Sequence, residues 1–351
     1  MGERIETPAS RTIIVLRFSA MGDVALLAAV LQEVVQQNPS VKIVMVSRPL
    51  FEALFLHIPQ IIFHGMDTKG VHKGVKGLHR LSKELQQYNA DAIADVHENL
   101  RSKTICFFCK KKGLQISQID KGRSEKKALT RKKNKILVPL KTTAQRYADV
   151  FFRLGLSVQL SNQLKKPSHK ISPTIAVLLG PVNNKKIGVS PFAQHQYKMY
   201  PLEKMEVVVK SLAARGYDVF IFGGGEKEKE VAEKWALASD QVTSFIGKIN
   251  LKEELDLISA LDLMISMDSA GMHLASLVGT TVVSIWGPTH PYAGFLGYGQ
   301  KLENCVQVPH PIRPNSIYGN KPCFAEGTTC IELVTVEMIL EKVEENLKQP
   351  S

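Results

Sequence analysis

The residues best suited to binding an anion lie in the second half of the chain. Residues 268–276 read Asp-Ser-Ala-Gly-Met-His-Leu-Ala-Ser, between the apolar segments 261–267 and 280–286. This order predicts a strand, a tight turn and a short helix that begins near Ser269. The free N–H groups and the positive dipole end of a helix N-terminus attract anions. Because Gly271 lets a ligand approach the backbone closely, we predict a phosphate site here.

A second candidate lies near the N-terminus, where residues 17–24 read Arg-Phe-Ser-Ala-Met-Gly-Asp-Val. The pattern predicts a strand-to-helix turn that bends at Gly22 and places Asp23 in the first helical turn. One interpretation is a carboxylate general base. The alternative is an acid that satisfies the free N–H groups at a helix start. The residue pattern alone leaves both interpretations open.

Three further residues have both a functional and a structural interpretation. Glu226 follows three glycines at a predicted strand-to-helix turn. It could accept hydrogen bonds from a ribose diol or cap its own helix. Lys198 could reach a phosphate or lie on the surface, and His273 could bind a ligand or pack structurally. The sequence has no Walker-type loop, H-E-x-x-H or G-x-S-x-G motif, which disfavours P-loop NTPases, metalloproteases and esterases.

Apolar runs alternate with helical patterns along both halves of the chain, which predicts parallel strands with helical crossovers. In the first half we predict strands at 12–16, 41–46, 60–63, 92–96 and 114–119, and helices at 23–37, 49–56, 78–88, 100–110 and 143–154. In the second half we predict strands at 186–190, 217–222, 242–246, 261–267 and 280–286, and helices at 201–215, 226–238 and 252–260, besides the helix after Asp268. The basic stretch 121–135 interrupts this alternation.

A chain of 351 residues suits two domains. The polar stretch 157–173, with Pro167 and Pro173, is predicted to be the linker. We therefore expect an N-terminal domain over residues 1–165 and a C-terminal domain over residues 175–351. Two doubly wound domains that face one another would form a central cleft at the C-terminal ends of their strands, where such sheets bind ligands.

Charge is concentrated in one part of the chain. The formal net charge is +12, and residues 101–135 hold 13 Lys and Arg but only 2 Asp and Glu. This segment could bind an anionic membrane surface or an acidic substrate, or it could be a solvated loop. Nucleic acid is disfavoured, because residues 121–135 contain no aromatic side chain for base stacking.

Cysteine content and hydropathy favour a cytoplasmic protein. Five cysteines argue against a disulfide framework, and we expect most of them to be buried thiols. Cys323 and Cys330 could pair or bind a metal. The longest apolar run, residues 24–31, is too short to span a bilayer, and residues 1–11 lack the apolar core of a signal peptide.

Taken together, these residues resemble glycosyltransferase family 9, the ADP-heptose–lipopolysaccharide heptosyltransferases. Five segments are similar to motifs of that family, in the same order. They are S-x-M-G-D-V at 19–24, D-x-x-x-D-x-x-x-x-x-R-S at 91–102, K-x-Y-P at 198–201, D-S-x-x-x-H-L-A at 268–275 and W-G-P-T at 286–289. Tyr200 and Ala270 depart from the commoner residues of the family, which puts the details of the nucleotide pocket in question.

The resemblance implies an α/β protein of the GT-B fold, with an N-terminal acceptor-binding and a C-terminal nucleotide-sugar-binding Rossmann-like domain. It implies inverting, metal-independent transfer of a heptose or related sugar from an ADP-sugar to a lipopolysaccharide core or lipid A-type acceptor. No cofactor is expected beyond the donor. Asp23 would be the base, and His97 and Arg101 would lie on the acceptor side. The donor would be bound by Lys198, Glu226, Asp268, Ser269, Ala270, Gly271 and His273.

The basic segment 101–135 would then face the inner surface of the cytoplasmic membrane or an anionic glycolipid, which places the protein at the periphery of that membrane. Three other functions stay open. A non-catalytic sugar-nucleotide or glycan-binding protein could keep the fold, a nucleotide-sugar epimerase would need no acceptor, and a nucleic-acid binder would use the basic segment.

Overall fold

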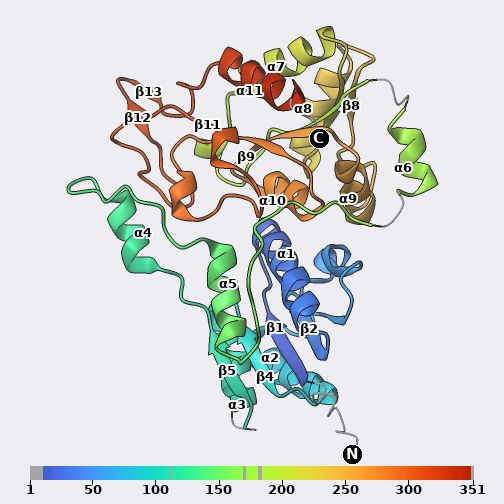
Figure 1. Ribbon diagram of the computed structural model, residues 1–351, viewed down its shortest axis with the longest axis vertical. Helices are drawn as coiled ribbons and strands as arrows, with labels where there is room; N and C mark the ends of the chain where they lie inside the picture. Colours follow the sequence, from blue (N-terminus) through green and yellow to red (C-terminus); the bar gives the residue numbers. More distant parts are fainter. Residues whose placement is uncertain (1–10, 111–112, 169–170, 181–183, 349–351) are drawn as a thin grey trace, which may run out of the picture. The chain divides into compact units, whose positions relative to one another are not determined.

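The computed structural model describes residues 11–348 except 111–112, 169–170 and 181–183, and the chain divides into two compact α/β units. The first unit comprises the described residues of Met1–Lys121 together with Thr143–Ser161. The second comprises those of Gly122–Thr142 and Asn162–Ser351 (Figure 1). The segment 122–142 therefore belongs to the second unit, although both of its neighbours in the sequence belong to the first. The predicted boundary kept residues 1–165 together and did not foresee this.

A five-stranded parallel sheet in the order β3-β2-β1-β4-β5 forms the centre of the first unit. The order reverses between β1 and β4, where Leu16 is paired with Asp95. Ligands of doubly wound sheets bind at such a reversal, beyond the carboxyl ends of the strands. The elements of this unit are β1 (Arg11–Leu16), α1 (Met21–Gln37), β2 (Val41–Ser47), β3 (Ile61–Gly65), α2 (Gly74–Glu84), β4 (Ala92–Asp95), α3 (Leu100–Lys110), β5 (Gln115–Gln118) and α5 (Thr143–Phe152).

Helices cover this sheet in two pairs, α1 with α5 and α2 with α3. The strands are rich in β-branched and small apolar residues, and β4 is buried along its whole length, as a parallel strand between two helical layers must be. Short 3-10 helices at Pro49–Phe55 and Leu85–Tyr88 complete the unit. The second of these replaces the last turn of the predicted helix 78–88.

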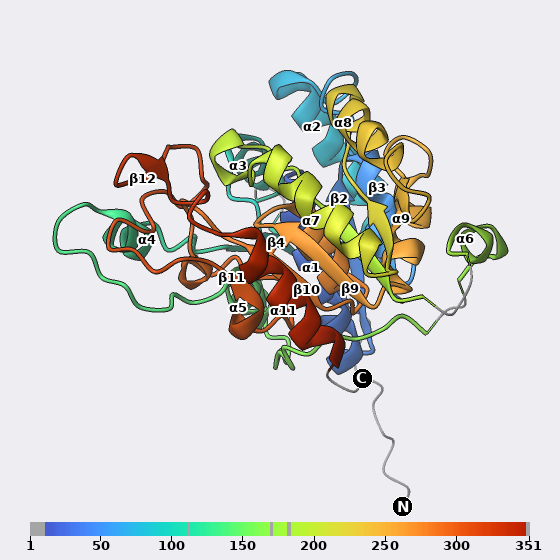
Figure 2. The same ribbon diagram turned by 90° about the horizontal axis from the view of Figure 1, so that it is seen from above.

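The second unit contains a six-stranded parallel sheet in the order β11-β10-β9-β6-β7-β8. Figure 2 labels three of these strands, β9, β10 and β11. Counted within the unit, this is the Rossmann order with its reversal between β6 and β9. The elements that build it are β6 (Lys186–Ser190), α7 (Leu202–Ala214), β7 (Asp218–Ile221), α8 (Glu226–Ala236), β8 (Val242–Ser244), α9 (Leu251–Ser259), β9 (Leu263–Met267), α10 (Ala270–Leu277), β10 (Val282–Ile285), β11 (Cys305–Val306) and α11 (Val336–Lys348).

The predicted strands and helices of both halves are present, with ends that differ by a few residues. Several elements were not predicted. They are α4 (Arg123–Thr130), α6 (Pro173–Leu178), β11, the antiparallel pair β12 (Phe324–Ala325) and β13 (Thr328–Thr329), α11, and the 3-10 helices Gln196–Lys198, Pro291–Ala293 and Leu302–Asn304. The helix α4 replaces part of the predicted basic interruption. Helix α11 had a readable signal, since its buried Ile339, Leu340 and Val343 follow helical spacing.

Within the described ranges, no helix combines the length and the apolar character that a membrane span requires. Parts of three predicted segments lie outside the described residues. They are residues 1–10 of the N-terminal segment, Lys111 and Lys112 of the basic segment, and residues 169–170 of the predicted linker.

Candidate active site

In each unit, the predicted site residues follow the two strands at which the strand order reverses, except Glu226, which follows β7. In the first unit these are β1 and β4, which lead to residues 17–23 and 95–102. In the second unit they are β6 and β9, which lead to Lys198 and to residues 268–273. Because parallel strands end at the same edge of a sheet, the topology brings each pair of segments together.

The Asp23 carboxylate is held by Arg17, which the sequence analysis did not single out. An Asp23 oxygen lies 2.6 Å from Arg17 Nη2, and the same oxygen accepts the Ala20 N–H at 3.2 Å. The arginine also donates to the Val96 carbonyl at 2.8 Å, which ties β1 to the end of β4. The Asp23 side chain is 29% exposed and the Arg17 side chain 11%. Asp23 therefore stabilises the helix start and also presents a fixed carboxylate.

His97 lies within reach of the charges of Arg17 and Asp23, on the loop after β4. Its Nδ1 accepts the Phe18 N–H at 3.2 Å, and its ring meets the Phe18 ring edge-on at 5.1 Å between centroids. Burial, followed by the positive charges of Arg17 and Lys121, lowers the pKa of His97 to about 3. The imidazole is therefore neutral at ordinary pH. A neutral ring here can hydrogen-bond a substrate hydroxyl without bringing another positive charge beside Arg17.

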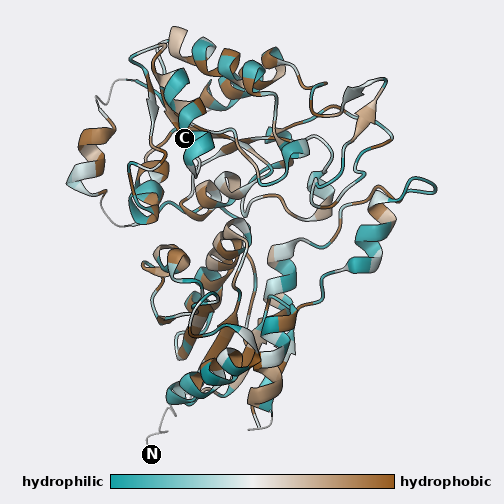
Figure 3. Cartoon of the chain, turned by 180° about the vertical axis from the view of Figure 1, so that it is seen from behind, coloured by the Kyte–Doolittle hydropathy of each residue, from teal (hydrophilic) through white to brown (hydrophobic). Residues whose placement is uncertain are grey.

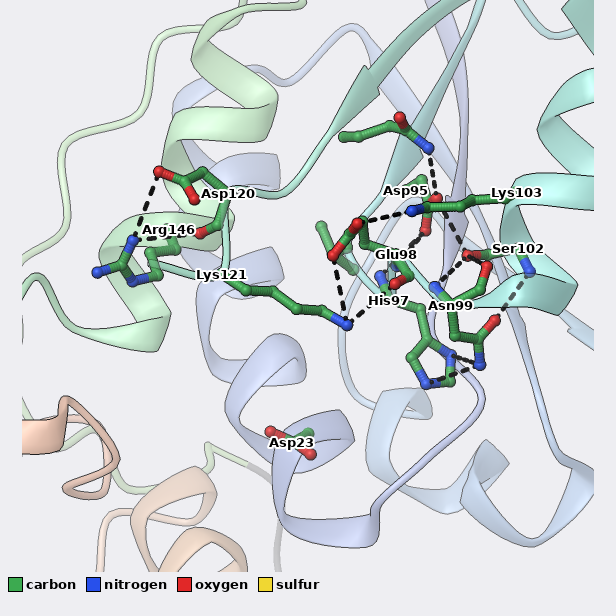
Figure 4. A network of polar contacts seen from close by, with 12 residues as sticks. Asp23, Asp95, His97, Glu98, Asn99, Ser102, Lys103, Asp120, Lys121 and Arg146 are labelled. Carbon is green, nitrogen blue, oxygen red and sulfur yellow. Dashed lines mark hydrogen bonds and ion pairs between the residues drawn. The ribbon is translucent and has the colours of Figure 1, made fainter. Parts of the chain in front are cut away.

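Asp95 holds the loop of His97 in place (Figure 4). This fully buried carboxylate accepts the N–H groups of His97 at 3.1 Å and Glu98 at 2.8 Å. It also accepts the Ser102 hydroxyl and the Gln118 amide, each at 3.0 Å. A buried charge is stable only when several donors surround it, and here those donors come from the loop, from α3 and from β5.

Glu98 and Lys121 form a second layer of the same network. Glu98 has a left-handed backbone with φ of 51°. Its carboxylate lies 2.8 Å from Lys103 Nζ and 3.5 Å from Lys121 Nζ. Lys121 also donates to the Glu98 carbonyl at 3.0 Å (Figure 4). Arg101, by contrast, is exposed on the first turn of α3, and its charge is close enough to lower the pKa of His97.

In the second unit, Lys198 and Asp268 form an ion pair with 2.9 Å between Nζ and the carboxylate. Their side chains are 15% and 6% exposed, so Lys198 is not the surface lysine that the sequence also allowed. Lys198 ends a 3-10 turn, Gln196–Lys198, and its stem lies against Gly319. A Cβ added to Gly319 would lie 2.1 Å from the lysine Cγ, so this glycine makes room for the stem.

Helix α10 begins after Asp268 as predicted, with Ser269 as its N-cap residue. The Ser269 hydroxyl is buried and has no hydrogen-bond partner in the described part of the chain. Ala270 and Gly271 form the first turn, and a Cβ on Gly271 would lie 2.3 Å from Ser190 Oγ. The glycine thus lets α10 pack directly on the end of β6. His273 is buried one turn further along.

Glu226 is exposed at the start of α8, with 77% of its side chain accessible. The residue that caps the preceding glycine turn is Glu228, whose carboxylate accepts the Gly224 N–H at 2.7 Å. A Cβ on Gly224 would meet nothing within 4 Å. The capping role considered for Glu226 therefore belongs to Glu228, and the Glu226 carboxylate stays exposed beside the glycine turn.

Two residues near the nucleotide motifs have structural roles. Tyr200, one of the departures from the family pattern, is fully buried and donates its hydroxyl to the Val334 carbonyl at 3.0 Å. Arg313, which the sequence analysis missed, is buried and donates to the carbonyls of Trp286 at 3.2 Å and Thr289 at 3.0 Å. Burial lowers its pKa to about 10, so it stays charged. Arg313 therefore fixes the W-G-P-T turn by hydrogen bonds to its backbone carbonyls.

The cysteines behave partly as expected. Cys106 and Cys109 are buried thiols, while Cys323 and Cys330 form a disulfide that closes the β12–β13 hairpin. This hairpin lines a cavity of about 270 Å³ together with Tyr197 and Met199, which flank Lys198. In the described ranges, no three His, Cys, Asp or Glu side chains gather in a group that could hold a metal ion.

The fold and these residues define the class of protein, a GT-B protein built from two Rossmann-like domains. The crystal structure of a family 9 glycosyltransferase from Veillonella parvula has the same fold, with a TM-score of 0.73 at 18% identity over 98% of this chain and 99% of that one. The heptosyltransferase WaaC of Escherichia coli with ADP gives a TM-score of 0.67 at 18% identity, over 96% of this chain and 99% of that one.

Sequence comparison identifies the family. The pattern of glycosyltransferase family 9 (heptosyltransferase) matches residues 78–316, and the chain belongs to this family. The lipopolysaccharide core heptosyltransferase OpsX of Haemophilus influenzae is 26% identical over 290 residues, which are 81% of each protein. The expectation drawn from the five sequence motifs, a glycosyltransferase of the heptosyltransferase family with a GT-B fold, is confirmed.

Proposed function

We propose that this protein is an inverting glycosyltransferase that moves a heptose, or a related sugar, from an ADP-sugar to a lipopolysaccharide core or lipid A-type acceptor. Membership of family 9 supports sugar transfer. The names of the relatives support the substrates, since OpsX is a lipopolysaccharide core heptosyltransferase and a WaaC structure contains ADP. The observation that carries the proposal is the Arg17-held, partly exposed Asp23 carboxylate.

Asp23 would act as the general base. It takes the proton of the acceptor hydroxyl while that oxygen attacks the anomeric carbon of the donor sugar. The bond from the anomeric carbon to the diphosphate oxygen breaks on the opposite side, so configuration inverts and ADP leaves with the bonding electrons. Arg17 fixes the carboxylate before the substrate arrives, which lowers the cost of orienting it.

The second unit would stabilise the leaving group. Lys198, the Ser269 hydroxyl and the N–H groups of Ala270 and Gly271 at the start of α10 would face the negative charge that ADP gains. Asp268 keeps the lysine ammonium in place at 2.9 Å. These fixed positive groups supply the charge that a metal ion supplies elsewhere, so the proposed mechanism needs no metal. Glu226 is exposed and would accept hydrogen bonds from the ribose diol, and His273 would support the same helix turn.

On the acceptor side we propose His97 and Arg101. His97 offers a neutral hydrogen-bonding ring, and Arg101 an exposed guanidinium for an acidic group of the glycolipid. The protein would work at the inner face of the cytoplasmic membrane. The basic segment proposed to face that membrane is divided between the two units, since α3 belongs to the first and residues 122–135 to the second.

Replacement of Asp23 tests the mechanism. We expect Asp23→Asn to lower kcat by about 10²–10⁴-fold while ADP affinity stays unchanged. The matched control is Asp67→Asn, an exposed carboxylate of the same unit that caps a turn by accepting the Lys69 and Gly70 N–H groups. Undiminished turnover in Asp23→Asn would remove this residue as the base. A wild-type protein that binds ADP but transfers no sugar would be a binding protein instead.

A thermal-shift screen tests the donor. A ligand that binds the native state raises the melting temperature, and we expect ADP to do so more than UDP or GDP. A clear preference for UDP or GDP would overturn the heptose donor while leaving the family intact. Incubating the enzyme with donor alone tests the remaining alternative, because an epimerase would convert the donor without any acceptor.

A further inference from the structure

One surface of the second unit combines exposed apolar residues with a high positive charge. It is formed by the strap, which we define as residues 131–141, after α4. The consecutive apolar residues Ile136, Leu137 and Val138 are 47%, 49% and 49% exposed. From residue 126 to residue 142 the chain has seven Lys and Arg and no acidic residue. Figure 3 shows the hydrophilic colour of the loop that leaves α4 and enters the strap.

The strap is tied to its unit at both ends. Before the apolar residues, Lys135 Nζ donates to the carbonyls of Pro311 at 3.1 Å, Ile312 at 2.6 Å and Pro314 at 2.9 Å. The Ile136 N–H donates to the Ala128 carbonyl of α4 at 3.1 Å. These bonds hold the first part of the strap against α4 and the loop at 311–314.

The far end of the strap is held equally closely. The Leu140 N–H donates to the Tyr292 carbonyl at 2.9 Å. At Gly294 the backbones touch, since an added Cβ would lie 2.8 Å from the Lys141 carbonyl oxygen. The three apolar residues are therefore exposed on a segment that is fixed to its unit at both ends.

Helix α4 anchors the strap to the rest of the unit. Its Leu129 is fully buried, and Lys126 lies over the Phe295 ring with 4.5 Å from Nζ to the ring centroid. By contrast, Arg131, Lys132 and Lys133 are exposed beside the apolar residues, and Lys141 is exposed at the other end. The surface thus has apolar residues in the middle and cations on both sides.

This arrangement suits an anionic lipid surface better than other partners. Apolar side chains enter the boundary between headgroups and acyl chains, while flanking Lys and Arg are attracted to anionic lipid. Proteins that bind single-stranded nucleic acid stack its bases on aromatic side chains, and residues 131–141 include no aromatic residue. The strap also presents no acidic side chain that would repel lipid phosphates.

We propose that the strap is a membrane-docking element, in which Ile136, Leu137 and Val138 enter the headgroup region of an anionic bilayer and the flanking lysines and arginines bind lipid phosphates. Membrane docking would bring the enzyme to a lipid-linked acceptor, and in that respect this proposal rests on the proposed function. Docking itself can be measured without sugar transfer.

Co-sedimentation with vesicles tests the proposal. The full-length protein should bind vesicles of phosphatidylcholine that contain about one-third phosphatidylglycerol, and binding should weaken with salt. The triple variant Ile136→Ser/Leu137→Ser/Val138→Ser should lose about tenfold in vesicle affinity. Lys132→Gln/Lys133→Gln should lose about tenfold or more and depend less on salt. The matched control is Leu237→Ser/Lys227→Gln, which changes exposed residues outside the strap and should bind as the wild type does.

Fluorescence reports insertion directly. Trp235 and Trp286 are buried, so Leu137→Trp adds one exposed indole. Its emission should shift to the blue with the anionic vesicles, and brominated lipid should quench it. The proposal is overturned if the wild-type protein does not bind these vesicles, or if the triple serine variant binds as tightly as the wild type. It is also overturned if the apolar residues instead hold two copies of the chain together in sedimentation velocity.

The same variants keep this proposal separate from the proposed function. The triple serine variant should transfer sugar at the wild-type rate to an acceptor without its lipid chains. Asp23→Asn should bind vesicles fully while losing transfer. Vesicle binding therefore tests the docking proposal, and sugar transfer to a lipid-free acceptor tests the proposed function separately.

Discussion

In both units, charged side chains follow the two strands at which the order of the sheet reverses, but the two units fix these side chains in different ways. In the first unit, charged side chains meet charged side chains, as in the pair of Arg17 and Asp23 at 2.6 Å. The buried Asp95 is surrounded by donors from three elements. In the second unit a single ion pair, Lys198–Asp268, stands beside a helix N-terminus whose donors are backbone N–H groups.

The difference matches what each unit is proposed to do. A proton acceptor must keep one orientation, so its carboxylate is braced before the substrate arrives. A diphosphate brings its own charges, and the proposed site would meet them with a lysine and with backbone N–H groups at a helix start. Replacing a side chain in the first unit should therefore misplace the Asp23 carboxylate. Replacing one in the second unit should remove positive charge or crowd the start of α10.

Of the four further variants that compare the two units, Lys198→Met should have the largest effect. Lys198→Met removes the cation proposed to face the leaving group and leaves Asp268 buried without its partner. We expect kcat to fall about 10²–10³-fold and the free energy of unfolding to fall by about 3 kcal/mol. Adding Asp268→Asn should restore most of the stability but none of the turnover. If the double variant recovers both, the lysine serves only the ion pair.

Arg17→Met should come next. It leaves Asp23 and the Val96 carbonyl without their shared donor, so the proposed base loses its fixed position. Because misplacing a catalytic group by about 1 Å can cost about 100-fold, we expect a loss of that order in kcat with little change in ADP affinity. Arg17→Lys should recover part of it. Weaker ADP binding in Arg17→Met would contradict the division of roles between the units.

Gly271→Ala tests the close packing of α10. The new Cβ would lie 2.5 Å from Ser190 Cβ, which cannot move away as a flexible chain end could. We expect a loss of about 2 kcal/mol in the free energy of unfolding and weaker ADP binding by calorimetry. Gly224→Ala is the control in the same unit, because open space surrounds that position and it should change stability by less than about 0.5 kcal/mol.

The smallest effect concerns pH. His97 has a folded pKa of about 3, below its usual value of 6.5, so the unfolded chain binds more protons between these two values. The contribution of His97 to stability is complete above pH 6.5 and is lost as pH falls toward 3. At pH 5.5 the loss is about 1 kcal/mol. His97→Asn keeps an acceptor for the Phe18 N–H, and its denaturation curves should lack this dependence.

The motif-bearing segments were predictable because each depends on local chemistry. The Asp268–Gly271 turn, the helix after Gly22 and the alternation of strands and helices all follow from residue type and spacing. Arg17 was not singled out, because an arginine at the end of an apolar strand has no motif of its own. That β1 and β4 are neighbours is shown only by the strand pairing of the folded sheet, in which Leu16 is paired with Asp95. Arg313 was missed for the same reason, since its partners are carbonyl groups far away in the chain.

Residue order by itself determined the class of the fold, the family and the positions of the helix starts, because hydrophobic period and turn chemistry act over a few residues. Tertiary structure alone decided that Arg17 holds Asp23, that Glu228 rather than Glu226 caps the glycine turn, and that residues 122–142 belong to the second unit. These outcomes depend on contacts between residues that are far apart in the sequence, and local sequence patterns do not specify such contacts.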